Sequence, residues 1–165
     1  MYENTIQLPS DANYTGLLYH GYDASDTAVW ASSDRGHSPE VWDRADGWFL
    51  MSLVDFLEFV PASQPLHTSA LSQLCNLIPH VLSQADPAWW LVITEPGREG
   101  NYFESSGAAM FVYSLLKAVR LGFVEDLDGR IIQVALDAYR YMIEHWVTAN
   151  DDGTMSWEGT VHVRI

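Results

Sequence analysis

Apolar residues recur at intervals of three and four in four stretches of the chain, the spacing that places side chains on one face of a helix. The four stretches cover residues 48–60, 66–85, 105–122 and 128–146. Pro61 ends the first stretch, and Pro79 interrupts the second, where the missing backbone donor predicts a kink. Because each apolar face needs a neighbour to cover it, the pattern predicts an all-α fold of packed helices.

Polar residues and a glycine mark the ends of the last two predicted helices. Ser105 or Ser106 can cap the third helix, and Gly122 is placed to end it. Asp128 can cap the fourth helix. Short loops after the first and third helices then join the four helices into two hairpins.

Longer segments that contain aromatic residues separate the two hairpins. Tyr19, Trp90 and Trp157 lie in these segments, each after an acidic turn, at intervals of about 70 residues. Long loops that recur at one point of each repeat lie on one face of a hairpin array, where such arrays place binding groups. Two repeats and a fraction do not close a ring. We therefore expect residues 1–165 to form a single partial domain that is truncated at both ends.

The net charge of the chain argues against some classes of binding partner. Asp and Glu number 22 and Lys and Arg number 8, so the net charge is −14. This charge repels phosphate groups and argues against nucleic acid and anionic membranes as partners, although an acidic surface also serves solubility alone. No apolar run reaches the length that spans a bilayer, and the polar start of the chain lacks the features of a signal peptide. We expect a soluble chain, and its cellular location is left open.

The cysteine and the histidines point to no metal or cofactor. Cys75 is alone, which excludes an internal disulfide, and its place on an apolar helical face predicts a small buried residue. The six histidines lack the close helical pairing of a metal site. We therefore predict no metal ion and no cofactor.

Aromatic residues make up 13% of the chain and include seven Trp. Pyranose rings stack their C–H faces on aromatic rings, although an aromatic core would also explain the bias. Candidate site residues are densest in residues 18–23 and 39–48. In the second segment Trp42, Arg44 and Trp48 combine aromatic faces with a guanidinium, which suits a sugar ring that carries a carboxylate.

Three blocks of sequence carry a resemblance to a known family. They are YHGYD at residues 19–23, WDRADGWFLMSLVD at 42–55 and GNYFESSGAAMF at 100–111. In order and spacing they resemble glycoside hydrolase family 105, the unsaturated rhamnogalacturonyl hydrolases. The resemblance implies a partial α/α six-hairpin toroid, since a full member is about twice this length. It also implies hydration of the C4=C5 double bond of unsaturated galacturonyl residues in oligosaccharides from pectin, by protonation of a vinyl ether and addition of water.

The resemblance assigns His20, Trp42, Arg44 and Trp48 to substrate binding. Structural roles remain open for each of these residues: a satisfied histidine, an ion pair of Arg44 with Asp46 or Glu40, and packing for both tryptophans. The general acid/base aspartate of the family would precede Met1, so the resemblance leaves the catalytic residue of this chain unknown.

The aspartates beside Arg44 differ in what they imply. Asp43 stands where the family usually has glycine, and a carboxylate there is expected to intrude on the cleft or alter its turn. Asp46 is a weak candidate for a substitute acid, because shielding by Trp42 and Trp48 would raise its pKa while Arg44 would lower it. Both aspartates could also serve simply as helix caps.

Two alternatives to an enzyme remain at this point. One is a non-catalytic carbohydrate-binding relic, and the other is a helical interaction module. Glu104, with the serines that follow it, is expected to cap a helix or align a loop rather than to catalyse. An arc of hairpins with uncovered apolar flanks is also expected to self-associate.

Overall fold

The computed structural model describes residues 1–25 and 27–161. The elements in this part of the chain are α1 (Tyr2–Thr5), α2 (Asp43–Phe59), α3 (Pro65–Ser83), α4 (Ser105–Arg120), α5 (Arg130–Trp146), β1 (Val147–Ala149) and β2 (Met155–Trp157). All four long helices predicted from the apolar spacing are present. The short antiparallel hairpin of β1 and β2, which pairs Val147 with Trp157, replaces part of what was expected to be a loop.

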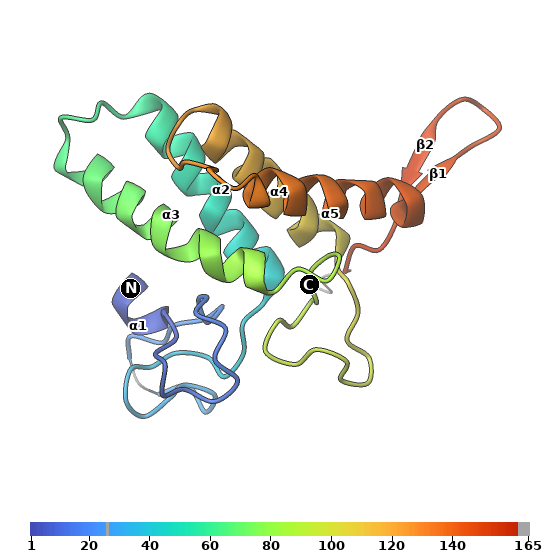
Figure 1. The fold of residues 1–165 in the computed structure, drawn as a ribbon. Coiled ribbons are helices and arrows are strands. Elements are labelled where there is room, and N and C mark those ends of the chain that lie inside the picture. The colour runs from blue at the N-terminus through green and yellow to red at the C-terminus, as the bar shows by residue number, and fades with distance from the viewer. Residues whose placement is uncertain (26, 162–165) are drawn as a thin grey trace.

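The two central helices are α2 and α4, which lie side by side while α3 and α5 flank them (Figure 1). Their shared core contains fully buried apolar side chains, among them Leu50, Val54, Leu74, Trp89, Phe111 and Leu115. The rings of Trp89 and Phe111 lie 5.0 Å apart, and the indole N–H of Trp89 donates to the carbonyl of Val81 at 2.8 Å. Helices pair as α2 with α3 and α4 with α5, which confirms the two expected hairpins.

The long segments before α2 and between α3 and α4 gather at one end of the helices, below them in Figure 1. Main-chain hydrogen bonds join these segments: Asp43 N–H donates to Leu91, Leu91 N–H to Tyr102, and Ser105 N–H to Gly159. The loops before α2 and between α3 and α4 therefore share one face as expected, whereas the β1–β2 hairpin, which contains Trp157, projects away from them (Figure 1). The candidate site lies on this face.

Helix ends differ from the sequence prediction in several places. The α2 helix begins at Asp43, five residues before the predicted start, and Trp42 precedes it in extended conformation. Glu104, and neither Ser105 nor Ser106, caps α4 by accepting the N–H of Gly107 at 2.7 Å. Pro79 lies within a helix that continues to Ser83.

Cys75 is exposed, so the prediction that it is buried is wrong. The buried stripe of α3 runs through Leu74 and Ile78, and Cys75 lies one residue, about 100°, around the helix from Leu74. Its thiol faces the carbonyl of Phe123 at 3.9 Å.

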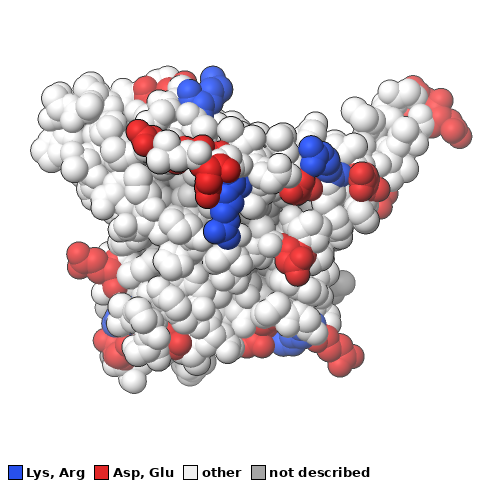
Figure 2. Space-filling view, viewed as in Figure 1, with Lys and Arg blue, Asp and Glu red and all other residues white. Residues whose placement is uncertain are grey.

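Charged side chains on the face shown in Figure 2 are scattered around its edge and over the upper helices, with Lys and Arg close to Asp and Glu. Between them lies a broad uncharged area. No helix in the described residues combines the length and the apolar character needed to cross a membrane.

Candidate functional site

Three of the four predicted site residues meet where the loop segment enters α2. The imidazole of His20 meets the indole of Trp42 edge-on, with ring centres 6.1 Å apart and an interplanar angle of 89°. The guanidinium carbon of Arg44 lies 5.4 Å from the centre of the same indole. Trp42 reaches this position because it precedes the first turn of α2 and pairs as an antiparallel bridge with Val92. The indole therefore contacts both a cation and an imidazole.

The hydrogen bonds of His20 define its tautomer. Its Nδ1 lies 3.0 Å from the carbonyl oxygen of Glu40 and 3.1 Å from Oγ of Ser38. Because a carbonyl only accepts, Nδ1 carries the hydrogen, and Nε2 of the neutral ring is an acceptor. The side chain is exposed, and its Nε2 has no hydrogen-bond partner among the described residues.

Arg44 forms an ion pair, but with a partner that was not expected. Its Nη2 donates to Oε1 of Glu104 at 3.0 Å and to the carbonyl of Val161 at 3.0 Å. Neither Asp46 nor Glu40 pairs with Arg44 in the described residues, and Glu40 instead pairs with Arg98 at 2.6 Å. The guanidinium is thus held against α4 while its plane stays beside Trp42.

Glu104 is the buried centre of this arrangement. It accepts hydrogen bonds from the N–H groups of Gly107 and Val161, from Ser106 and from Arg44. Burial raises the pKa of Glu104, but these donors outweigh burial and leave the pKa below its usual value. The carboxylate therefore stays charged. It caps α4, which is one of the roles expected for it, and it also orients Arg44, which was not expected.

Asp43 is buried between α2 and α4, and the expectation that it intrudes on the cleft is wrong. Its Oδ1 accepts the N–H of Arg44 at 2.7 Å, and its Oδ2 has no partner among the described residues. The close approach of Gly107, where a Cβ would clash with Oδ2 of Asp43, explains how α4 makes room for the carboxyl group. Burial, and then the negative charge of Glu104, raises the pKa of Asp43 to about 9.

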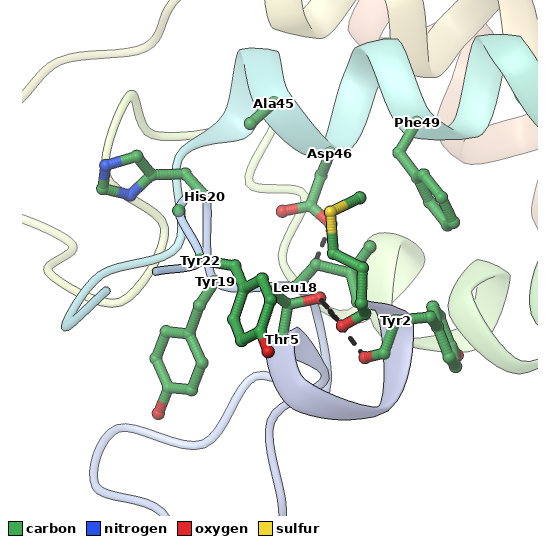
Figure 3. Close-up of a pocket in the computed structure, with 11 residues that line it drawn as sticks. Tyr2, Thr5, Leu18, Tyr19, His20, Tyr22, Ala45, Asp46 and Phe49 are labelled. Atoms are coloured by element: carbon green, nitrogen blue, oxygen red, sulfur yellow. Dashed lines mark hydrogen bonds between the residues drawn. The ribbon is translucent and has the colours of Figure 1, made fainter. Parts of the chain in front are cut away.

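Asp46 lies on another side of the same helical turn. Its Oδ1 accepts the N–H of Leu18 at 3.1 Å, and its Oδ2 has no partner in the described part of the chain. Burial raises its pKa well above the usual value, and because Arg44 is engaged by Glu104 the opposing effect expected from Arg44 is absent. The carboxyl group borders a pocket of about 150 Å³ with Tyr2, from which the imidazole of His20 projects away (Figure 3).

A second pocket, of about 230 Å³, lies beside the indole of Trp42. It is lined by His20, Glu40, Trp42, Leu91, Val92 and Val161. Chain segments far apart in the sequence meet here, and Leu91, Val92 and Val161 were not expected in the site, because no polar or aromatic signal marks them. Trp48 stands apart on α2 and is 58% exposed, so its ring is available to solvent rather than packed in the core.

The part of the chain that the structure describes forms no evident metal site. Among residues 1–25 and 27–161, which leave out His162, no three side chains of His, Cys, Asp or Glu converge as ligands of a metal ion would. What the arrangement offers is a fixed guanidinium beside an indole, an imidazole acceptor, and two buried carboxyl groups whose pKa values burial raises.

Comparisons with known proteins identify the family of this chain. The family model described as Glycosyl Hydrolase Family 88 matches residues 5–164. Protein Atu3128 of Agrobacterium fabrum is 36% identical over an alignment of 165 positions, which covers 96% of this chain and 68% of that protein. A family 105 glycoside hydrolase structure from C. acetobutylicum is 36% identical, with a TM-score of 0.83 over 93% of this chain and 41% of that one.

A structure described as a possible member of the GH105 family, from Salmonella enterica, shares the fold at 24% identity, with a TM-score of 0.73 over 98% of this chain and 38% of that one. The chain thus spans about two fifths of the solved structures that it matches. These matches confirm the expected family resemblance and the helical toroid architecture, of which the described residues form a part. The chain belongs to Glycosyl Hydrolase Family 88.

Proposed function

We propose that this chain forms the substrate-binding wall of an enzyme that hydrates the C4=C5 double bond of unsaturated galacturonyl residues in pectin fragments. The observation that carries the proposal is the guanidinium of Arg44 beside the indole of Trp42, next to the exposed acceptor Nε2 of His20. A uronate ring presents a carboxylate for the guanidinium, a C–H face for the indole and hydroxyl groups for the imidazole. Trp48 offers a further exposed ring on the same helix.

The proposed reaction needs a proton donor and a water molecule. The donor gives a proton to C4, water adds to C5 and loses a proton, and the hydrated ring opens with release of the attached sugar. Asp46 meets one condition for a donor, because burial raises its pKa well above the usual value and so favours the protonated form. It fails a second condition, because the carboxyl group is fully buried and turned toward Leu18.

The first experiment tests recognition of the carboxylate. Calorimetric titration of the chain with an unsaturated galacturonyl–rhamnose disaccharide is compared with titration of the methyl ester of the same disaccharide. Loss of the charge that Arg44 recognises is expected to weaken binding about tenfold or more, the difference of one charge-assisted hydrogen bond. Equal affinity for the acid and the ester, or binding of neither, would overturn the proposal.

The second experiment follows the ultraviolet absorbance of the double bond, which hydration removes. Because the resemblance places the general acid outside residues 1–165, we expect this chain to bind the disaccharide and leave its absorbance unchanged. A loss of absorbance that Asp46→Asn abolishes would assign the acid to Asp46. The matched control is Asp43→Asn, which changes the other buried carboxyl group of the same turn.

A second candidate function is carbohydrate binding without hydrolysis. It is favoured by the burial of both Asp43 and Asp46, and by the ion pair that engages Glu40 at the Trp42 pocket. An amino-terminally extended chain, in which residues 1–165 follow the corresponding upstream segment of the C. acetobutylicum protein, separates the two. Hydration of the disaccharide by the extended chain supports the enzyme, and binding without hydration supports the binding module.

A further inference from the structure

The largest of the pockets around His20 is unused by the site described above. Its volume is about 470 Å³, within the range of about 300–1,000 Å³ that small-molecule sites occupy. It is lined by His20, Gly21, Trp30, Ser38 and Pro39. Because His20 also lines the pocket beside Trp42, the two pockets are neighbours that share one imidazole.

The lining of this pocket combines an aromatic wall with few polar groups. Trp30 is 46% exposed, so its ring is open to a ligand. Gly21 keeps the space beside the ring free, since a Cβ there would lie 3.6 Å from Cη2 of Trp30 and 3.4 Å from Cβ of Ser38. None of the lining residues carries a carboxylate, a guanidinium or an ammonium group.

The polar groups of the pocket differ in availability. The hydroxyl of Ser38 is engaged by the N–H of Gly21 at 3.0 Å and by Nδ1 of His20 at 3.1 Å. Nε2 of His20 has no hydrogen-bond partner among the described residues. A ligand in this pocket therefore meets the indole ring of Trp30 and, at His20, an imidazole nitrogen that has no partner among the described residues.

We propose that this pocket is a second sugar subsite, in which Trp30 stacks on the face of an uncharged pyranose ring. The inference rests on the proposed function, because the neighbouring ring is then the uronate beside Trp42 and Arg44. An uncharged ring fits because it needs no ion-pair partner, its C–H face suits the indole, and one hydroxyl can donate to Nε2 of His20. In this arrangement the uronate ring of an oligosaccharide binds beside Trp42 and Arg44, and an uncharged ring binds beside Trp30.

Two variants change the pocket by different means. Trp30→Ala removes the stacking ring. Gly21→Leu leaves the ring in place and fills the space beside it, at a residue whose backbone lies outside the left-handed region and accepts a side chain. The matched control is Trp157→Ala, since Trp157 is 44% exposed and lies in β2. Circular dichroism verifies the fold of each, and if one variant fails to fold, the other decides.

The measurement is a nuclear magnetic resonance titration with two probes, galacturonate and the unsaturated galacturonyl–rhamnose disaccharide. Both pocket variants are expected to weaken binding of the disaccharide about five- to tenfold, the effect of one aromatic contact, and to leave galacturonate unaffected. Trp157→Ala is expected to match the unmodified chain. Unchanged disaccharide affinity in a folded pocket variant overturns the subsite alone, whereas an unmodified chain that binds neither probe overturns the proposed function with it.

Discussion

Two aspartates in the first turn of α2 are buried, although their position in the helix would also suit exposed capping residues. Asp43 and Asp46 are both fully buried, and each leaves one oxygen without a partner among the described residues. A helix N-terminus favours a charged carboxylate by a fraction of 1 kcal/mol to about 1 kcal/mol, whereas removal of that charge from water costs several kcal/mol. Burial therefore outweighs the helix dipole: it raises the pKa of Asp43 to about 9 and the pKa of Asp46 well above its usual value.

This burial predicts that the folded chain becomes less stable as pH rises. The pKa of Asp43 is 3.8 when unfolded and about 9 when folded, so between these values the folded state holds the extra proton and stability is lost with increasing pH. Asp43→Asn is expected to reduce the slope between pH 5 and 8 by up to roughly 1 kcal/mol per pH unit. Urea unfolding across this range measures it, with the exposed Asp151→Asn as control. An unchanged slope in Asp43→Asn would refute the buried acid.

The ion pair of Arg44 and Glu104 gives a second prediction for single residues. Glu104→Gln keeps the shape of the side chain but leaves the partly buried guanidinium without its counter-charge. We expect a loss of about 2 to 3 kcal/mol in unfolding free energy, toward the low end for buried pairs because Arg44 retains some exposure to water. The same change removes the negative charge beside Asp43 and flattens the pH slope in part. Wild-type stability and slope together would contradict both effects.

At the scale of helices, apolar spacing was sufficient to predict the four long elements, but the ends depended on how loops fold back. The turn before α5 places Gly129 in the left-handed region, with φ of 72°. Through this turn Asp126 reaches two free N–H groups, those of Ile131 at 2.9 Å and Ile132 at 3.0 Å. Asp128, the predicted cap, accepts only the N–H of Arg130 at 3.2 Å. The spacing of apolar residues does not predict such a turn.

Asp126→Ala is therefore expected to destabilise the chain by about 1 to 2 kcal/mol, the loss of a full helix cap. Asp128→Ala removes a longer, single hydrogen bond and is expected to cost less than half as much. Chemical unfolding of the two variants under identical conditions makes the comparison. If Asp128→Ala proved the more damaging change, the capping assignment would be reversed.

The approach of α2 and α4 yields another prediction at this scale. Gly107→Ala would place a Cβ against Oδ2 of Asp43 and 3.1 Å from the backbone nitrogen of Arg44. We expect a loss of about 1 to 3 kcal/mol, as for other overpacked cores. The double variant Gly107→Ala with Asp43→Gly removes the side chain that causes the clash and is expected to recover part of this loss. Additive destabilisation in thermal unfolding would place the strain elsewhere.

For the whole molecule, the sequence predicted the polar and aromatic residues of the candidate site better than its aliphatic ones. His20, Trp42 and Arg44 could be predicted to converge because their types and spacing carry the family resemblance. Leu91 and Val161 could not. Leu91 reaches the site through main-chain hydrogen bonds with Asp43 and Tyr102, and Val161 reaches it through hydrogen bonds with the side chains of Arg44 and Glu104. The resemblance also left open how Arg44 is held, since its partner Glu104 lies 60 residues away. Contacts between residues far apart in the sequence hold the site together, and a single sequence does not reveal these contacts.

The outer face of α5 carries an exposed apolar surface on which copies of the chain could associate. Its exposed apolar residues, Ile132, Leu136, Tyr139 and Ile143, are spaced as one helical stripe. We propose that this stripe drives self-association. The net charge of −14 opposes contact between copies, and salt screens that repulsion, so association should strengthen as salt is raised.

Sedimentation velocity over a concentration series at low and high salt measures this association. The double variant Leu136→Glu with Ile143→Glu places two charges in the stripe and is expected to remain monomeric at both salt concentrations. Phe59→Glu is the matched control, because Phe59 is 79% exposed at the end of α2 and lies outside the stripe. Equal association of the double variant and the unmodified chain would show that another surface brings the copies together, since only a contact through α5 must desolvate the new carboxylates.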